Sequence, residues 1–299
     1  QDFSIVKESK RRALINQIHQ QFFSDTKFSA RMLREEINWY KDQLLFDREE
    51  YIRADRSGRR FPLVSSMRNR IYDAMKAYYK RLGKQVEWSD LPRVVWKNWR
   101  HKLPKYDAVL IDEGQFFAPL WYALIKEALK DKAHLFIVAD PSQGFLKRGQ
   151  SWLASGLEVR GRTSIIQRSY RTTREIMAFA TKMYQFRLPD DADTVAPDLA
   201  GMPEGRPPEI IPLTSSQDEM TRVINEIEAL QEAGIPWEHL LVLHTDSYQV
   251  WPLVRRLQEK FGEEVVVNLW DRDVDVKNKL RVCALDAATG FESPIVFVL

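Results

Sequence analysis

The amino-acid sequence predicts an α/β protein with parallel sheets, preceded by a helical region. Apolar residues recur at three- and four-residue spacing in 11–23, 30–46 and 65–82, which is typical of helices that bury one face. Short apolar strands are then expected at 107–111 and 135–139, and each is followed by acidic residues. A helix expected from about Pro119 to Lys130 joins the two strands. Strands joined by helices in this way indicate parallel pairing.

Further strand-like runs predict that the α/β pattern continues to the end of the sequence. These runs lie at 240–244, 264–268, 281–285 and 294–299. A second α/β unit is expected to begin near Ser164. We therefore predict a helical, basic region at 1–105, part of a first α/β domain at 106–163 and a second α/β domain at 164–299.

Composition limits the class of protein. The 299 residues are 44% hydrophobic and 29% charged, which is typical of a globular chain. No apolar run approaches the roughly 18 residues of a membrane span, and the first residues do not look like a signal peptide. Cys283 is the single cysteine, so no intramolecular disulfide can form. We expect a cytoplasmic protein with no membrane partner.

Charge is distributed unevenly along the chain. The first 105 residues hold 24 Lys and Arg against 13 Asp and Glu, giving +11, and the remainder holds 21 against 29, giving −8. The basic third is interpreted either as a surface for nucleic acid or as a solvated helical surface. Arg56, Arg59 and Arg60 crowd one loop, where we expect phosphate contacts. Trp96 and Trp99 alternate with basic residues, which favours either stacking on bases or packing in the core.

Candidate catalytic side chains follow the first two strands. Because ligands bind at the carboxyl ends of parallel strands, Asp112, Glu113 and Asp140 lie where chemistry is expected. Asp112 could hold magnesium and Glu113 could orient the attacking water, although acidic pairs also follow strands without such a role. Gln143 could sense a terminal phosphate or lie in an exposed turn. Arg171, just before a helix, could reach a phosphate or pair with a nearby acid.

The order of these motifs resembles a known family. Asp-Glu-x-Gln after one strand, Asp-x-x-Gln after the next and Tyr-Arg-Thr before a helix resemble motifs II, III and IV of the UvrD/Rep/PcrA-like superfamily 1A DNA helicases. Residues 241–245 resemble the short strand motif that follows, and 282–297 resemble motif V. The resemblance is firm from Tyr106 to Leu299 and looser over 51–103. It implies two RecA-like (P-loop NTPase-type) parallel-sheet domains, the first incomplete and carrying a helical insertion.

The resemblance also implies cofactors, partners and residue roles. ATP and Mg²⁺ would be the cofactors, and single-stranded or partly duplex DNA would be the partner. Asp112 would bind the metal, Glu113 would be the catalytic base, Gln143 would sense the γ-phosphate and Arg171 would reach it from the second domain. The residues near the nucleotide would be Tyr170, Gly290 and Glu292. The further nucleic-acid contacts would be Phe145, His244 and Thr245.

The sequence departs from the family in several places. Leu146 stands where the family usually has Tyr, and Thr289 stands where it usually has Lys. No Gly-x-x-x-x-Gly-Lys-Ser/Thr loop occurs to hold phosphates, and the last arginine-rich motif is missing. The sequence also begins with Gln and ends inside an apolar run, so we expect a piece of a longer protein.

Three functions remain open at this level. The first is a fragment of an ATP-dependent helicase or translocase of 3′-to-5′ polarity, which alone would be inactive because it lacks the phosphate loop. The second is a non-catalytic helicase-like subunit that binds DNA or protein. The third is the helicase part of a helicase–nuclease.

Overall fold

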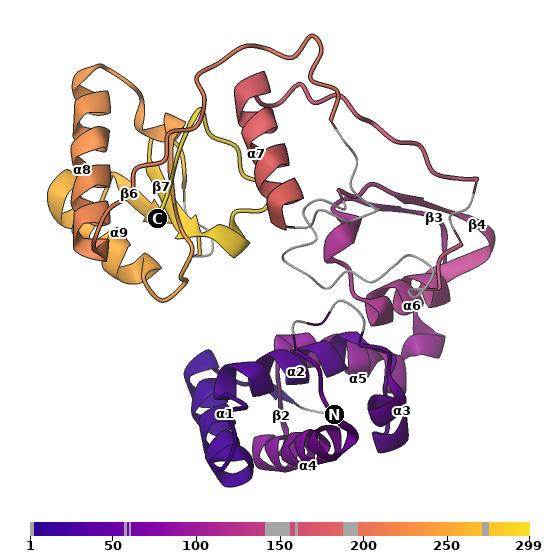
Figure 1. The fold of residues 1–299 in the computed structure, drawn as a ribbon. Helices are drawn as coiled ribbons and strands as arrows, with labels where there is room; N and C mark the ends of the chain where they lie inside the picture. Colours follow the sequence, from indigo (N-terminus) through magenta and orange to yellow (C-terminus); the bar gives the residue numbers. More distant parts are fainter. Residues whose placement is uncertain are drawn as a thin grey trace. The chain divides into compact units, whose positions relative to one another are not determined.

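The structure is a computed structural model that describes residues 3–56, 59, 61–140, 156–158, 161–187, 197–270 and 275–299. The chain divides into two compact units, Gln1–Arg206 and Pro207–Leu299. The sequence predicts that the second domain begins near Ser164, whereas the second compact unit begins 43 residues later, at Pro207. Figure 1 labels helices and strands of both units.

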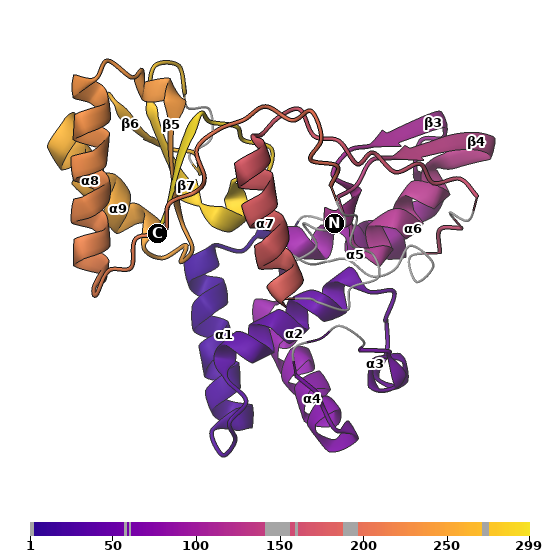
Figure 2. The same ribbon diagram turned by 45° about the horizontal axis from the view of Figure 1, so that its top comes forward.

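The first hundred residues are helical, as the sequence predicts. The helices are α1 (Glu8–Phe23), α2 (Ala30–Asp42), α3 (Arg48–Arg53), α4 (Ser65–Leu82) and α5 (Leu91–Asn98), with short 3-10 turns η1 (Trp88–Asp90) and η2 (Arg100–Lys102). Two short strands, β1 (Ser4–Ile5) and β2 (Gln85–Val86), pair in parallel. Figure 2 shows α1 beside α4, and the two helices are in contact. Side-chain caps begin α2 at Ser29 and α3 at Asp47.

The core of this helical region is rich in aromatic side chains. The rings of Phe23 and Phe28 lie 4.9 Å apart, and those of Tyr40 and Tyr51 lie 5.8 Å apart at nearly a right angle. Edge-on and tilted arrangements of this kind are favourable for aromatic rings. The aliphatic residues Ile18, Leu33, Ile37 and Ile71, none of them solvent-exposed, pack in the same cluster.

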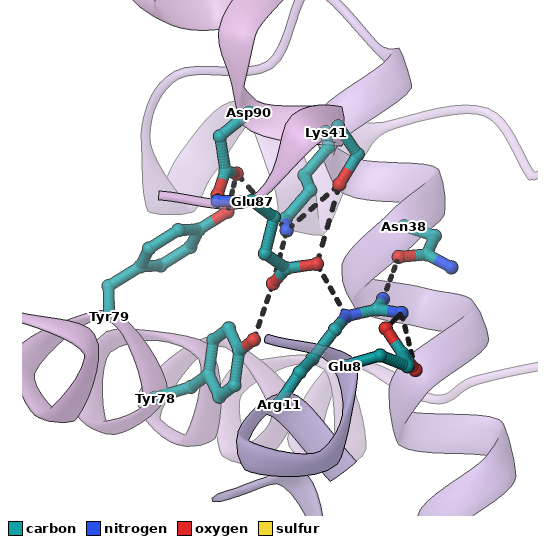
Figure 3. A network of polar contacts seen from close by, with 9 residues as sticks. Glu8, Arg11, Asn38, Lys41, Tyr78, Tyr79, Glu87 and Asp90 are labelled. Atoms are coloured by element: carbon teal, nitrogen blue, oxygen red, sulfur yellow. Dashed lines mark hydrogen bonds and ion pairs between the residues drawn. The ribbon is translucent and has the colours of Figure 1, made fainter. Parts of the chain in front are cut away.

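A buried polar network also holds the helical region together (Figure 3). Lys41 on α2 is fully buried, and its Nζ lies 2.6 Å from Glu87 and 3.1 Å from Asp90. Arg11 on α1 reaches the same Glu87 at 2.5 Å, and the Tyr78 hydroxyl of α4 donates to it. Burial alone would raise the pKa of Glu87, but the charges of Lys41 and Arg11 outweigh burial and lower it. Residues far apart in sequence therefore share one buried charge cluster.

The second part of this unit contains the two strands that the sequence predicts. β3 (Tyr106–Ile111) and β4 (Leu129–Ile137) pair in parallel, and α6 (Pro119–Ala128) connects them through the 3-10 turn η3 (Gly114–Phe116). β4 begins earlier than expected, because the helix ends at Ala128 and the charged segment after it joins the strand through a register shift. Helix α7 (Arg174–Arg187) comes later in the same unit.

The second unit is a four-stranded parallel sheet with helices on one face. Its strands are β5 (Leu240–His244), β6 (Val266–Asn268), β7 (Leu280–Ala284) and β8 (Ile295–Val298), in the order β6-β7-β5-β8. Its helices are α8 (Ser216–Glu232) and α9 (Val250–Phe261), with 3-10 turns η5 (Trp237–His239) and η6 (Leu285–Ala287). Figure 1 shows α8 and α9 beside the sheet, and their apolar residues pack on Leu240 and Val242 of β5.

The architecture confirms a mixed α/β protein with parallel sheets. The four strands of the second unit lie within two residues of their predicted bounds, because continuous apolar runs bounded by polar loops specify buried strands. Across the described ranges, no helix combines the length and apolar character that crossing a membrane would require.

Candidate functional site

The carboxyl ends of β3 and β4 bring the predicted acidic residues together. The register pairs Leu110 with Phe136 and Ile111 with Ile137, so the two strands end side by side. The Val138 backbone N–H donates to the Ile111 carbonyl at 2.8 Å, and this extends the pairing to the last residue of β3. Asp112 and Glu113 follow β3, while Asp140 follows β4 three residues after the strand. Parallel pairing therefore places the acidic pair and Asp140 at one edge of this sheet.

The backbone at the acidic pair turns sharply. Glu113 has φ 54° and ψ 41°, in the left-handed region that non-glycine residues rarely adopt. Its N–H donates to Asp112 Oδ1 at 2.9 Å, which helps to hold this turn. Strained backbone of this kind is concentrated at functional sites and persists where surrounding contacts impose it.

Gly114 is part of what imposes the turn. Its N–H donates to the Val138 carbonyl at 2.9 Å, and its own carbonyl accepts from the Tyr122 hydroxyl at 2.6 Å. A Cβ atom at this position would lie 2.5 Å from Ile137 Cγ2, so only glycine fits between the strands and α6. Burial raises the pKa of Tyr122 to about 12, so its hydroxyl stays protonated and keeps donating at neutral pH.

Gln115 joins the two strand ends. Its buried side chain donates from Nε2 to Glu113 Oε2 at 2.7 Å and accepts at Oε1 from the Asp140 backbone N–H at 2.9 Å. One amide thus orients the Glu113 carboxylate and fixes the start of the loop after β4. The sequence motif contained Gln115, but reasoning from sequence gave it no role. The signal was available, because an amide two residues after an acidic pair can donate and accept at once.

The arrangement leaves carboxylate oxygens accessible. Asp112 is exposed, and Glu113 and Asp140 are half-buried. Within the described ranges, no three His, Cys, Asp or Glu side chains gather as a metal site. A magnesium ion commonly binds through one or two carboxylates and takes its other ligands from phosphate oxygens and water. The donor set at Asp112 and Glu113 fits that kind of site.

The other predicted residues between β4 and α7 are the phosphate sensor Gln143, the nucleic-acid contact Phe145, and Tyr170 and Arg171, which were expected to reach the nucleotide from the second domain. Gln143 and Phe145 fall outside the described residues, as does Leu146. Tyr170 and Arg171 lie in the bend that precedes α7, and both side chains are exposed. The Arg171 N–H donates to Ser169 Oγ at 3.4 Å.

The predicted residues of the second unit lie around its sheet. His244 ends β5, and its Nδ1 accepts from the Asp246 N–H at 2.9 Å, while the Thr245 N–H donates to the Leu299 carbonyl at 2.8 Å. Gly290 has φ 82°, which explains glycine there. The exposed Glu292 accepts at its backbone carbonyl from Arg281 Nη1 at 3.0 Å.

Two of the predicted phosphate-binding arginines have a partner inside the protein. Glu36 on α2 is fully buried, and it pairs with Arg56 and, at 3.0 Å, with Arg59. The Tyr51 hydroxyl donates to the same carboxylate at 2.9 Å. The Arg56 side chain is only 6% exposed, so its guanidinium is directed to Glu36 and away from solvent. Arg60 lies outside the described residues.

The two predicted tryptophans are half-buried at the end of α5. The Trp96 ring stacks on Phe46 with centroids 6.4 Å apart and planes 12° apart. The Arg100 guanidinium carbon lies 5.1 Å from the centre of the Trp96 ring. Trp99 ends the helix through its N–H, which donates to the Val95 carbonyl at 2.8 Å. Trp96 therefore supports an arginine in addition to packing.

Comparison with known proteins adds no family to this geometry. No protein-family model matches the chain, and none of the curated proteins matches its sequence. The candidate site is thus defined by the residues that the ends of β3 and β4 bring together.

Proposed function

We propose that this chain is part of an ATP-dependent DNA helicase or translocase of the UvrD/Rep/PcrA-like type, with 3′-to-5′ polarity taken from the resemblance. The observation that carries the proposal is the bridge by Gln115 between Glu113 and the backbone of Asp140. In a helicase motor, this tie between Asp140 and Glu113, the acid that would orient the attacking water, would let the nucleotide state at the end of one strand affect the end of the next.

The proposed chemistry divides between two carboxylates. Asp112 would bind Mg²⁺ together with the nucleotide phosphates, since it is the exposed member of the pair. Glu113 would accept a hydrogen bond from the attacking water, and its half-buried position with Gln115 as donor keeps one carboxylate oxygen oriented. Gln143 and Arg171 would contact the terminal phosphate, and this part of the proposal rests on the resemblance.

The 299 residues supply only part of such a site. They contain no Gly-x-x-x-x-Gly-Lys-Ser/Thr loop, so no lysine and no row of backbone amides is available in that form for the phosphates. Positioning supplies most of the rate in phosphoryl transfer. We therefore expect no meaningful ATP hydrolysis by this chain alone, and hydrolysis by a protein that carries it together with a phosphate-binding loop.

A steady-state ATPase assay with single-stranded DNA tests the proposal. It compares the 299-residue chain, a longer natural protein containing it, and the Glu113→Gln variant of that protein. We expect turnover only from the longer protein and at least a hundredfold loss in the variant. Asp131→Asn is the control, because Asp131 is an exposed acid near the start of β4, away from the carboxyl ends of β3 and β4.

Each other outcome is informative. Robust turnover by the 299 residues alone would contradict the need for a separate phosphate loop. An inactive longer protein would favour the second candidate, a non-catalytic subunit that binds DNA or protein, to which the substitutions Leu146 and Thr289 also point. Equal losses of ATPase activity in Glu113→Gln and Asp131→Asn would contradict a catalytic role for the carboxyl ends of β3 and β4.

A further inference from the structure

Eight of the 24 Lys and Arg side chains of the helical region form ion pairs within it. Glu36 binds Arg56 and Arg59, and Glu87 binds Arg11 and Lys41. Four further pairs lie on the surface: Arg31 with Glu35, Arg48 with Asp73, Arg53 with Glu49 and Arg70 with Asp25. The large positive charge of this region is therefore a poor guide to where an anion would bind, and the positions of the uncompensated cations matter more.

One group of uncompensated cations lies at the end of α5 and in η2. This basic ridge consists of the cations Lys97, Arg100 and Lys102 together with His101, whose Nε2 accepts a hydrogen bond from Arg100 Nε at 3.1 Å. Lys97, His101 and Lys102 are exposed, Arg100 is half-buried, and none of the four is ion-paired within the described ranges. The sequence has no acidic residue between positions 90 and 107, so no local carboxylate offsets the charge.

Aromatic rings lie beside the basic ridge, and a further cation, Arg93, is buried near it. Arg100 lies over the Trp96 ring, and Lys97 Nζ lies 5.8 Å from the centre of the Phe46 ring. Arg93 is buried and donates to the carbonyls of Tyr40 at 2.9 Å and of Gln43 at 3.2 Å, and among the residues that the structure describes it has no carboxylate ion-pair partner. Burial, and after it the positive charge of Arg93, lowers the pKa of Lys97. Positive charge here is crowded, and an anion would relieve it.

We propose that the basic ridge binds the phosphate backbone of a single-stranded nucleic acid, and that the Arg56–Arg59 loop serves the fold instead. Identification of the strand as nucleic acid rests on the proposed function. The charge and geometry of the ridge are independent of it. Because Trp96 already stacks on Phe46 and carries Arg100, its role is to hold the guanidinium in place, and Arg100 is the group that meets the ligand.

The chemistry of the ridge favours a nucleic acid over other polyanions. A guanidinium held over an aromatic ring, as Arg100 is over Trp96, presents its N–H groups in a planar fork that matches phosphate oxygens, and it loses little freedom on binding. Lys97 and Lys102 flank it as point charges suited to neighbouring phosphates. The ridge has no exposed large apolar side chain of its own that would insert into a membrane.

Fluorescence anisotropy with a labelled oligothymidylate of 20 nucleotides tests this proposal on the 299-residue chain in the absence of ATP. The ridge variant is Lys97→Gln with Arg100→Gln and Lys102→Gln. The matched control is Lys76→Gln with Lys80→Gln and Lys84→Gln, which removes the same charge from exposed positions on α4 and just after it. Thermal melts at 222 nm confirm folding, and Lys102→Gln alone serves if the triple variant is unfolded.

We expect the ridge variant to bind at least about tenfold more weakly at low salt. We also expect the slope of log K against log salt to become shallower by about 2, because each phosphate contact on a single strand contributes roughly 0.7. Lys102→Gln alone should weaken binding two- to threefold, and the α4 control should change it less than twofold. Because the assay contains no ATP, a failed ATPase result leaves this outcome unaffected.

Three results would overturn the proposal. The first is equal weakening by the ridge variant and the α4 control, which would indicate a diffuse field of charge. The second is absence of binding by the unmodified chain at low salt. The third is ridge-dependent binding of poly-glutamate, or of vesicles containing anionic lipid, as tight as that of the oligonucleotide, which would assign the ridge to an acidic protein or a membrane.

Discussion

Replacing Lys41 with methionine should strongly destabilise the helical region. Lys41 is fully buried, and its Nζ pairs with both Glu87 and Asp90 (Figure 3). Lys41→Met keeps the length of the side chain and removes its charge. Both carboxylates then stay buried without the lysine. Arg11 still pairs with Glu87 at 2.5 Å.

The size of the effect follows from this geometry. Removing one partner of a buried ion pair typically costs about 3–5 kcal/mol, because the other charge is left uncompensated. Arg11 still contacts Glu87, so we expect the lower end of this range, about 3 kcal/mol. For a unit of roughly 200 residues, each kcal/mol lowers Tm by about 2–4 °C, which gives a decrease of about 6–12 °C.

Circular dichroism at 222 nm, during thermal and urea unfolding, measures the change. The control is Lys76→Met, since Lys76 lies on the exposed side of α4, and its free energy of unfolding should change by less than about 0.5 kcal/mol. Equal effects from the two variants, or no loss in Lys41→Met, would contradict the reasoning about the buried cluster.

The effect should also depend on pH in a defined direction. The pKa of Glu87 is lowered in the folded protein, from 4.5, because Lys41 and Arg11 outweigh its burial. A lowered carboxylate pKa contributes stability above about pH 4.5 and loses it as the pH falls through the folded pKa. The difference between the original chain and Lys41→Met should therefore begin to shrink below about pH 4.5, where Glu87 of the unfolded chain takes up a proton, and shrink further as the pH falls through the lower pKa of folded Glu87. A difference that is the same at pH 7 and pH 4 would refute this explanation.

Three further predictions concern other parts of the structure. Arg56→Met should lower the free energy of unfolding by about 2–3 kcal/mol, since it removes a cation from a buried carboxylate. In the same urea titration, Arg53→Met should cost less than about 0.5 kcal/mol, because that arginine is 81% exposed. Gly114→Ala should destabilise the unit by about 1–3 kcal/mol, because the new methyl would lie 2.5 Å from a side-chain carbon of β4. An unchanged Tm would show that the neighbouring side chains move to accommodate the methyl. Cys283 is fully buried, so a thiol reagent should label it only as urea unfolds the sheet of residues 207–299, and rapid labelling of the native protein would contradict its burial.

The sequence alone was sufficient for the main elements of the fold. The run 240–244 predicts β5 at its observed bounds, and the parallel β3–β4 pair with its connecting helix follows from two apolar strands and a helical pattern between them. These features depend on neighbours in sequence: an apolar run specifies a buried strand, and parallel strands need a crossover. The same logic predicts Asp112, Glu113 and Asp140 at one edge of the sheet.

The sequence could not identify the partners of buried polar groups. Arg56 in its loop reads as a phosphate-binding arginine because the nearby sequence offers few acids, yet Glu36, twenty residues earlier on α2, pairs with it. Lysine is rarely buried, yet Lys41 is fully buried between Glu87 and Asp90. Gln115 has two partners, one of which is a backbone amide 25 residues away.

The physical reason is the same in each of these cases. Whether a charge can be buried depends on which opposite charges or hydrogen-bonding groups surround it in space, since burial without them is costly. That set of neighbours is created by the packing of α1, α2 and α4 and by the register of β3 with β4, and none of it is local in sequence. Hydrophobic periodicity determined which elements this chain forms, and the tertiary structure decided which of its charges hold the fold together and which remain available to a ligand.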